Sequence, residues 1–264
     1  MTGFSPDWLA LREPHDLAAR NRNVLHAVTA HFNQRNGLSI ADLGCGTGST
    51  WRALAPALAA GQQWRMIDND PVLLARIGQH SGIATVKCDL AASLETALND
   101  AAALVVTSAL LDLVSDAWLE RLVALVVMQR SAFYAALSYD GRTTFSPVDE
   151  TDEKIVSAVN EHQRRDKGFG PALGPDGATK AIERFRRAGY SVIEGPSDWL
   201  FEADHREIQR ACLSGWATAA GETGRLPSAA VSGWLQRRLS LVDGGQSRIS
   251  VGHVDFFATP IGER

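Results

Sequence analysis

Apolar and polar residues alternate in different ways along the chain. From about residue 38 to 137, short apolar runs are separated by stretches whose apolar residues recur at helical spacing. The runs lack strict polar alternation, which is typical of strands buried on both faces of a parallel sheet. They predict strands at 38–43, 63–68, 84–89, 103–108 and 131–137. The stretches between them predict helices at 50–60, 71–77, 90–98 and 115–128.

The pattern changes on both sides of this region. Before it, residues 16–33 are amphipathic and predict one N-terminal helix. After it, SYDGRTTFSPVDETDE is polar and turn-rich, which predicts an irregular connection. The remaining elements are a helix at 151–167, a loop at 168–177, a helix at 178–188, strands at 190–194 and 248–259, and two helices within 203–241.

Strands and helices that follow one another in series favour right-handed crossovers and a doubly wound α/β sheet. We therefore predict a seven-stranded, mostly parallel sheet with a helical insertion before the last strand. We expect a single domain in three parts: a helical region at 1–37, a core at 38–137, and a half at 138–264 that carries a lid loop and the insertion.

Composition and charge limit the binding partners, the structural cross-links and the cellular location that we expect for the protein. The formal charge of -4 does not favour tight binding to nucleic-acid phosphates. Cys45, Cys88 and Cys212 form no CxxC pair, which argues against a disulfide framework or a structural zinc site. The first thirty residues carry no apolar segment suited to a signal peptide, and no apolar run reaches the roughly 20 residues of a membrane helix. We expect a cytoplasmic protein that does not enter a membrane.

The strongest local motif is the turn Gly44-Cys45-Gly46-Thr47-Gly48, between a predicted strand and a predicted helix. Glycine lacks a Cβ, so the chain can turn tightly and a ligand can lie against its backbone. A phosphate-binding loop would end in Gly-Lys-Ser/Thr and a dinucleotide motif would have glycine at position 49, which is Ser49. The alternative is a tight strand-to-helix connection without a ligand.

The next predicted strands also end in polar residues. Asp68 ends the second strand, Asp89 ends the third and is followed by Leu90, and Ser108 ends the fourth. Carboxyl ends of parallel strands meet at one edge of a sheet, where ligands of such sheets bind. A carboxylate there can accept hydrogen bonds from both hydroxyls of a ribose. Asp70 before Pro71 is better placed than Asp68 to cap the next helix, whereas Asp89 is equally well explained as a turn residue.

The turn, with Asp42 two residues before it and acids at successive strand ends, resembles class I S-adenosylmethionine-dependent methyltransferases over residues 38–137. The resemblance implies a Rossmann-like methyltransferase fold with an antiparallel last strand. It also implies S-adenosylmethionine as cofactor, with S-adenosylhomocysteine as product. The positions that match the family's cofactor site are Asp42, Gly44, Cys45, Gly46, Gly48, Asp68, Asn69, Asp89, Leu90 and Ser108.

Several acceptor classes lack their usual motifs. The segment after the fourth strand reads SALLDLV, without the Pro-Pro-aromatic motif of amino-methylating enzymes of nucleic acids and protein glutamine. No cysteine follows a proline, as in cytosine C-methylating enzymes, and we find no acidic cluster like that of magnesium-dependent catechol enzymes. We expect a small-molecule acceptor and no metal, because transfer from a sulfonium depends mainly on positioning.

Candidate acceptor-side residues lie outside the predicted sheet. His162 is a candidate general base, and Lys167 with Phe169 a candidate substrate contact in an ordered lid. The alternative for this segment is a solvated helix end. Asp112 is a candidate substrate contact or a helix cap. Arg12, His15 and Arg20 are candidates to contact the cofactor carboxylate or the substrate, or simply form an amphipathic helix.

Two other functions stay open at this point. One is a tRNA or rRNA methyltransferase, which would show a continuous basic face beside the pocket. The other is a catalytically idle subunit that binds the cofactor or a protein partner. The apolar helical region is also compatible with a contact between two copies of the chain in a homodimer.

Overall fold

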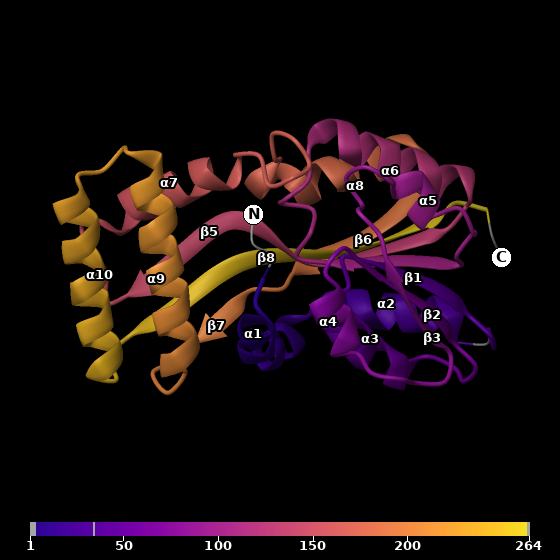
Figure 1. The fold of residues 1–264 in the computed structure, drawn as a ribbon, viewed down its shortest axis with the longest axis horizontal. Coiled ribbons are helices and arrows are strands. Elements are labelled where there is room, and N and C mark those ends of the chain that lie inside the picture. Colours follow the sequence, from indigo (N-terminus) through magenta and orange to yellow (C-terminus); the bar gives the residue numbers. More distant parts are fainter. Residues whose placement is uncertain (1–3, 34, 263–264) are drawn as a thin grey trace.

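A computed structural model describes residues 4–33 and 35–262 of the chain. One sheet runs through these residues in the order β3-β2-β1-β4-β5-β8-β6, with the short β7 paired to β8 (Figure 1). The strands are β1 (Ser39–Leu43), β2 (Gln63–Asp68), β3 (Ile83–Lys87), β4 (Leu104–Ser108), β5 (Ala132–Ser146), β6 (Tyr190–Pro196), β7 (Trp199–Phe201) and β8 (Arg248–Pro260).

The pairing matches the predicted doubly wound topology. Strands β1 to β5 pair in parallel, and β8 lies antiparallel to β5, β6 and β7. The mostly parallel α/β sheet and its antiparallel last strand are therefore confirmed. The sequence did not predict β7, whose three residues follow β6 closely. The prediction of strands buried on both faces was wrong for β3, because β3 lies at the end of the sheet and most of its residues are partly or fully exposed.

Helices cover both faces of the sheet (Figure 1). On one face, α2 (Arg22–Phe32), α3 (Ser49–Leu54) and α4 (Pro71–Ala75) enclose a core with the strands. On the other, α5 (Leu94–Ala97), α6 (Asp116–Met128) and α8 (Gly177–Arg187) enclose a second core. Ser115 caps α6 as its polar side chain predicts, accepting a hydrogen bond from the Trp118 backbone N–H at 3.3 Å. Helices α3 and α5 are shorter than predicted.

The long strand β5 corrects the predicted irregular connection. Residues 138–146, which are polar and turn-rich in sequence, continue β5 and pair with β8 through two register shifts. This extension carries α7 (Asp152–Gln163), α9 (Arg206–Thr223) and α10 (Ser228–Asp243), which share a third core with it at one end of the molecule (Figure 1). Helices α9 and α10 are the two helices predicted before the last strand. The backbone pairing with β8 overrides the local turn preference, which is why sequence pattern alone misses it.

The N-terminal region forms two helices where one was predicted. Helix α1 (Pro6–Ala19) ends before Asn21, whose side chain caps α2 by accepting hydrogen bonds from the backbone N–H groups of Asn23 and Val24, both at 3.1 Å. The cap fixes a bend between the helices. As a result α1 lies across the carboxyl edge of the central strands, near α3 and β7, instead of continuing α2.

Candidate functional site

The glycine turn has a backbone that requires glycine. Gly44, Gly46 and Gly48 adopt left-handed φ values of 67°, 54° and 87°. The Gly44 and Cys45 backbone N–H groups donate to the Ile67 carbonyl at 2.9 and 3.1 Å, which fastens the turn to β2. A Cβ added to Gly46 would lie 3.2 Å from Leu9 Cδ1 on α1. The turn therefore brings bare backbone to the carboxyl edge of the sheet, between β1 and α3.

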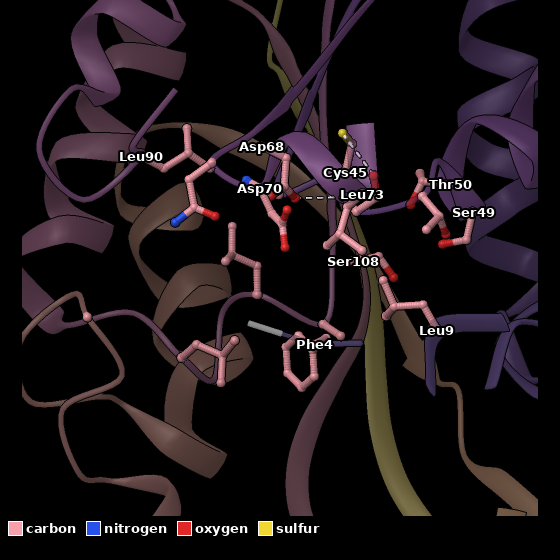
Figure 2. A pocket seen from close by; sticks show the side chains of 18 of the residues that line it. Phe4, Leu9, Cys45, Ser49, Thr50, Asp68, Asp70, Leu73, Leu90 and Ser108 are labelled. Atoms are coloured by element: carbon pink, nitrogen blue, oxygen red, sulfur yellow. Dashed lines mark hydrogen bonds between the residues drawn. The ribbon is translucent and has the colours of Figure 1, made fainter. Parts of the chain in front are cut away.

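A cavity of about 450 Å³ opens at this edge, within the size range of small-molecule sites. It is bounded by the ends of β1 to β4, by α1 and by the loop that follows α7 (Figure 2). Eleven residues that the sequence offered as candidates lie together in its lining: Arg12, Gly44, Cys45, Gly46, Asp68, Asn69, Asp89, Leu90, Ser108, Lys167 and Phe169. Residues far apart in the sequence thus meet in one hollow.

Asp68 at the end of β2 is held in a fixed orientation. One carboxylate oxygen accepts a hydrogen bond from the Gly46 backbone N–H at 2.8 Å, and the other accepts one from the Asp70 N–H at 2.9 Å. Asp70 caps α4 through the Val72 N–H at 2.8 Å, as predicted, so Asp68 is not needed as a cap. A carboxylate oxygen has two lone pairs, so Asp68 can still accept hydrogen bonds from a ligand.

The ends of β3 and β4 contribute a different surface. Asp89 accepts a hydrogen bond from the Ala91 N–H at 2.9 Å, so it forms a turn and lines the cavity at the same time. The Leu90 carbonyl accepts a hydrogen bond from the Trp118 indole at 2.6 Å, which fixes this segment against α6. After β4, Ala109 has a φ of 51°, uncommon for a residue with a Cβ and typical of functional sites.

Helix α1 forms one wall of the cavity. From the sequence, the polar residues of this region could equally belong to an ordinary amphipathic helix. Phe4, Leu9, Arg12 and Asp16 line the cavity from this side, and Figure 2 shows Phe4 and Leu9 across the hollow from Asp68. Arg12 Nε pairs with Asp16 at 2.9 Å, and the Trp199 indole donates to Asp16 at 2.9 Å. The spacing of Arg12 and Asp16, one helical turn apart, is visible in the sequence, but their position over the cavity depends on the bend before α2.

The loop after α7 forms the opposite wall, with Lys167, Gly168 and Phe169 in the lining. The Asp166 carboxylate accepts hydrogen bonds from the backbone N–H groups of Gly168 and Gly170 at 2.7 and 3.0 Å. Phe169 packs edge-on against Trp118, with ring centroids 5.4 Å apart. The loop is therefore held in one conformation beside the cavity.

Six candidate residues do not line the cavity: His15, Arg20, Asp42, Gly48, Asp112 and His162. His15 packs edge-on against Phe201 and His205. The candidate base His162 lies on α7, where Nε2 contacts the Glu222 carboxylate at 2.7 Å and Nδ1 contacts the Lys167 amine at 3.3 Å. Asp112 is buried beside the loop, and Ser115 rather than Asp112 caps α6. Burial raises the Asp112 pKa to about 6. Gly48 ends the turn at the start of α3, and Asp42 precedes the turn in β1.

Asp42 is fully buried, and neither carboxylate oxygen has a hydrogen-bond partner among the described residues. Burial raises its pKa to about 7, the Arg20 charge opposes that rise, and the Asp68 charge adds to it. Arg20 lies beneath the turn, donating to the Tyr134 hydroxyl and the Thr50 hydroxyl, both at 3.1 Å. Buried polar side chains therefore support the turn from behind.

Comparison with known proteins identifies the fold. No family model matches the chain, and no curated protein sequence matches it. The cyclopropane synthase MmaA2 from Mycobacterium tuberculosis superposes with a TM-score of 0.52 at 10% identity, over 97% of this chain and 94% of its own. A candidate type II methyltransferase from Anaeromyxobacter dehalogenans gives a TM-score of 0.51 at 16% identity, over 92% of this chain and 97% of its own.

A methyltransferase from Thiobacillus denitrificans, solved with S-adenosyl-L-homocysteine, covers 98% of this chain and 100% of its own at 13% identity and a TM-score of 0.47. Similarities with TM-scores above 0.5, such as these with MmaA2 and the Anaeromyxobacter protein, confirm the class I methyltransferase fold that the glycine turn and strand ends predict. At these identities the similarity concerns the fold alone. Among residues 4–33 and 35–262, no helix is long and apolar enough to cross a membrane, and no cluster of three or more His, Cys, Asp or Glu residues could hold a metal ion.

Proposed function

We propose that this protein transfers a methyl group from S-adenosylmethionine to a small-molecule acceptor, without a metal and mainly by positioning. One observation carries the proposal: the left-handed Gly44 and Gly46 and the oriented Asp68 carboxylate meet in one cavity of about 450 Å³ at the carboxyl edge of a methyltransferase-type sheet. Ligands of open α/β sheets bind at this edge.

The residues of the cavity fit the proposed cofactor. The bare backbone at Gly44 and Gly46 leaves room for the methionine part, and Asp68 retains lone pairs for the ribose hydroxyls. Leu73 and Leu90 offer apolar surface for the adenine ring, with Asp89 at its edge. When bound, S-adenosylmethionine supplies a methyl group activated by a positively charged sulfur.

The chain's own contribution is to orient the reactants and exclude water. Ser108 and Ala109 face the cavity at the end of β4, between the glycine turn and the space enclosed by α1 and the loop after α7. Phe4, Leu9 and Phe169 give that space apolar surface, which helps to exclude water from a charged sulfur centre. His162 has no part in this proposal because it is paired outside the cavity.

The experiment is a transfer assay with methyl-deuterated S-adenosylmethionine. The protein is incubated with a small-molecule extract and, separately, with total RNA, and deuterated methyl groups are sought by mass spectrometry in both. Asp68→Ala is the inactive control and Asp100→Ala, an exposed surface acid, is the matched control. We expect label in at least one small molecule with the wild type and with Asp100→Ala.

Label in RNA alone would contradict the small-molecule acceptor and support the RNA enzyme instead. Binding of S-adenosylmethionine without transfer to either pool would support a catalytically idle subunit. Equal labelling by wild type and Asp68→Ala would show that this cavity does not hold the cofactor.

A further inference from the structure

The charges that line the cavity are unevenly distributed. Asp68, Asp70 and Asp89 lie at the ends of β2 and β3, on the side proposed for the nucleoside. The two cations of the lining, Arg12 and Lys167, come from α1 and from the loop after α7. Asp16 also lines the cavity from α1, so the walls proposed for the acceptor carry two cations and one carboxylate.

Arg12 is matched by a carboxylate within the protein. Its Nε and Nη2 donate to the two oxygens of Asp16 at 2.9 and 3.2 Å. Asp16 also accepts the hydrogen bond of the Trp199 indole, and the Arg12 guanidinium lies 4.9 Å from the Trp199 ring centroid. The pair is neutral as a unit, so Arg12 adds little net charge to the cavity.

Lys167 is not matched in this way. The half-buried ammonium makes no ion pair with a carboxylate in the described part of the chain, and its one hydrogen-bonding contact is His162 Nδ1 at 3.3 Å. Burial lowers the pKa of Lys167, the charge of Glu222 opposes that shift, Arg165 adds to it, and Asp112 opposes it. A cation held in a partly buried position without a partner is stabilised by an anion that enters the cavity.

The surroundings of Lys167 suit a ligand with an apolar body and one anionic group. Leu113 and Phe169 also line the cavity, Phe169 two residues after Lys167 in the same loop, and both offer apolar contact. Asp112 is buried next to Leu113 in the chain; burial raises the pKa of its carboxyl and the charges of Arg12 and Lys167 lower it. A second negative charge on the ligand would meet this acid. These features favour a monoanionic carboxylate over a dianionic phosphate.

We propose that the methyl acceptor is a small carboxylic acid whose carboxylate binds Lys167, with its hydrocarbon part against Leu113 and Phe169. The inference rests on the proposed function, because it assigns the acceptor of that same cavity. Such an acceptor is an anion at neutral pH, so its carboxylate can pair with the Lys167 ammonium without a base from the protein.

The test is isothermal titration calorimetry on protein saturated with S-adenosylhomocysteine. Two matched pairs of probes differ only in charge: benzoate with benzamide, and propionate with propionamide. The variants are Lys167→Met, Lys167→Arg and Lys154→Met, the last removing an exposed lysine from α7 as the control. Thermal unfolding of each variant verifies that it is folded.

We expect at least one acid to bind about tenfold more tightly than its amide, the value of one charge-assisted hydrogen bond. The preference should disappear in Lys167→Met and persist in Lys167→Arg and Lys154→Met. If neither acid is preferred by the wild type, or if Lys167→Met keeps the preference, the inference is wrong. If Lys167→Met weakens S-adenosylhomocysteine binding itself, Lys167 serves the cofactor and the inference is also wrong. Failure of the wild type to bind S-adenosylhomocysteine would contradict the proposed function instead.

Discussion

Two neighbouring arginines on α10 provide a sharp test of how the helical insertion is held together. The side chain of Arg238 is 0% exposed, pairs with the Asp152 carboxylate at the start of α7, and donates to the Pro147 carbonyl at 2.6 Å. The side chain of Arg237 is 51% exposed and pairs with Asp149 at 2.6 Å. The two positions therefore compare a buried ion pair with a surface one on the same helix.

The magnitudes follow from burial. Arg238→Met leaves the Asp152 carboxylate buried with only the Trp234 indole and the Asp149 backbone N–H as hydrogen-bond donors, at 2.8 and 2.7 Å. Removing one partner of a buried pair costs about 3–5 kcal/mol, which lowers the melting temperature of a chain of this size on the order of 10 °C. Arg237→Met removes a solvent-screened pair and costs at most about 1 kcal/mol.

The assay is urea unfolding of wild type, both single variants and Arg238→Met combined with Asp152→Leu. The double variant removes both charges, so it should recover most of the stability lost in Arg238→Met. Equal destabilisation by Arg237→Met and Arg238→Met would refute the reasoning. So would a double variant that is less stable than Arg238→Met alone.

Two further predictions concern the glycine turn. Gly46→Ala and Gly37→Ala both place a Cβ at a left-handed φ, so each variant should lose about 1–2 kcal/mol of stability. Only Gly46→Ala should weaken S-adenosylhomocysteine binding in calorimetry, because Gly37 is outside the cavity lining. The folded-state pKa of Asp42, about 7, lies above its unfolded value of 3.8, so the folded state binds the proton more tightly. The free energy of unfolding of the wild type should therefore decrease as the pH rises from about 4 to 7. Asp42→Asn removes this pH-dependent contribution, which is worth up to about 4 kcal/mol. If the free energy of unfolding, measured from pH 4 to pH 8, changes with pH equally in wild type and variant, the assignment is contradicted.

The features predicted well from sequence are those fixed by local chemistry. The glycine turn, the acids at strand ends and the Ser115 cap each depend on a few neighbouring residues. The parallel pairing of β1 to β5 follows from the serial arrangement of strands and helices, because each helix returns the chain to the same edge of the sheet. Local pattern was therefore sufficient to place the Asp68 side of the cavity.

The features that were missed depend on contacts between distant segments. The polar residues 138–146 become part of β5 because β8 pairs with them from more than a hundred residues away. Arg12 and Asp16 reach the cavity because Asn21 caps α2 and ends α1 before it. His162 was a candidate base by residue type. In the structure α9 brings Glu222 beside it, and the His162 ring contacts the Glu222 carboxylate outside the cavity lining.

The central claim is that this cavity binds S-adenosylmethionine through the glycine turn and Asp68. Calorimetry of S-adenosylhomocysteine with wild type, Asp68→Ala and the surface control Asp100→Ala tests it most directly. Loss of hydrogen bonds to a carboxylate is worth about 1.5–3 kcal/mol, so Asp68→Ala should bind roughly 10- to 150-fold more weakly while Asp100→Ala binds as the wild type does. No binding by the folded wild type, or equal affinity of wild type and Asp68→Ala, would contradict the claim.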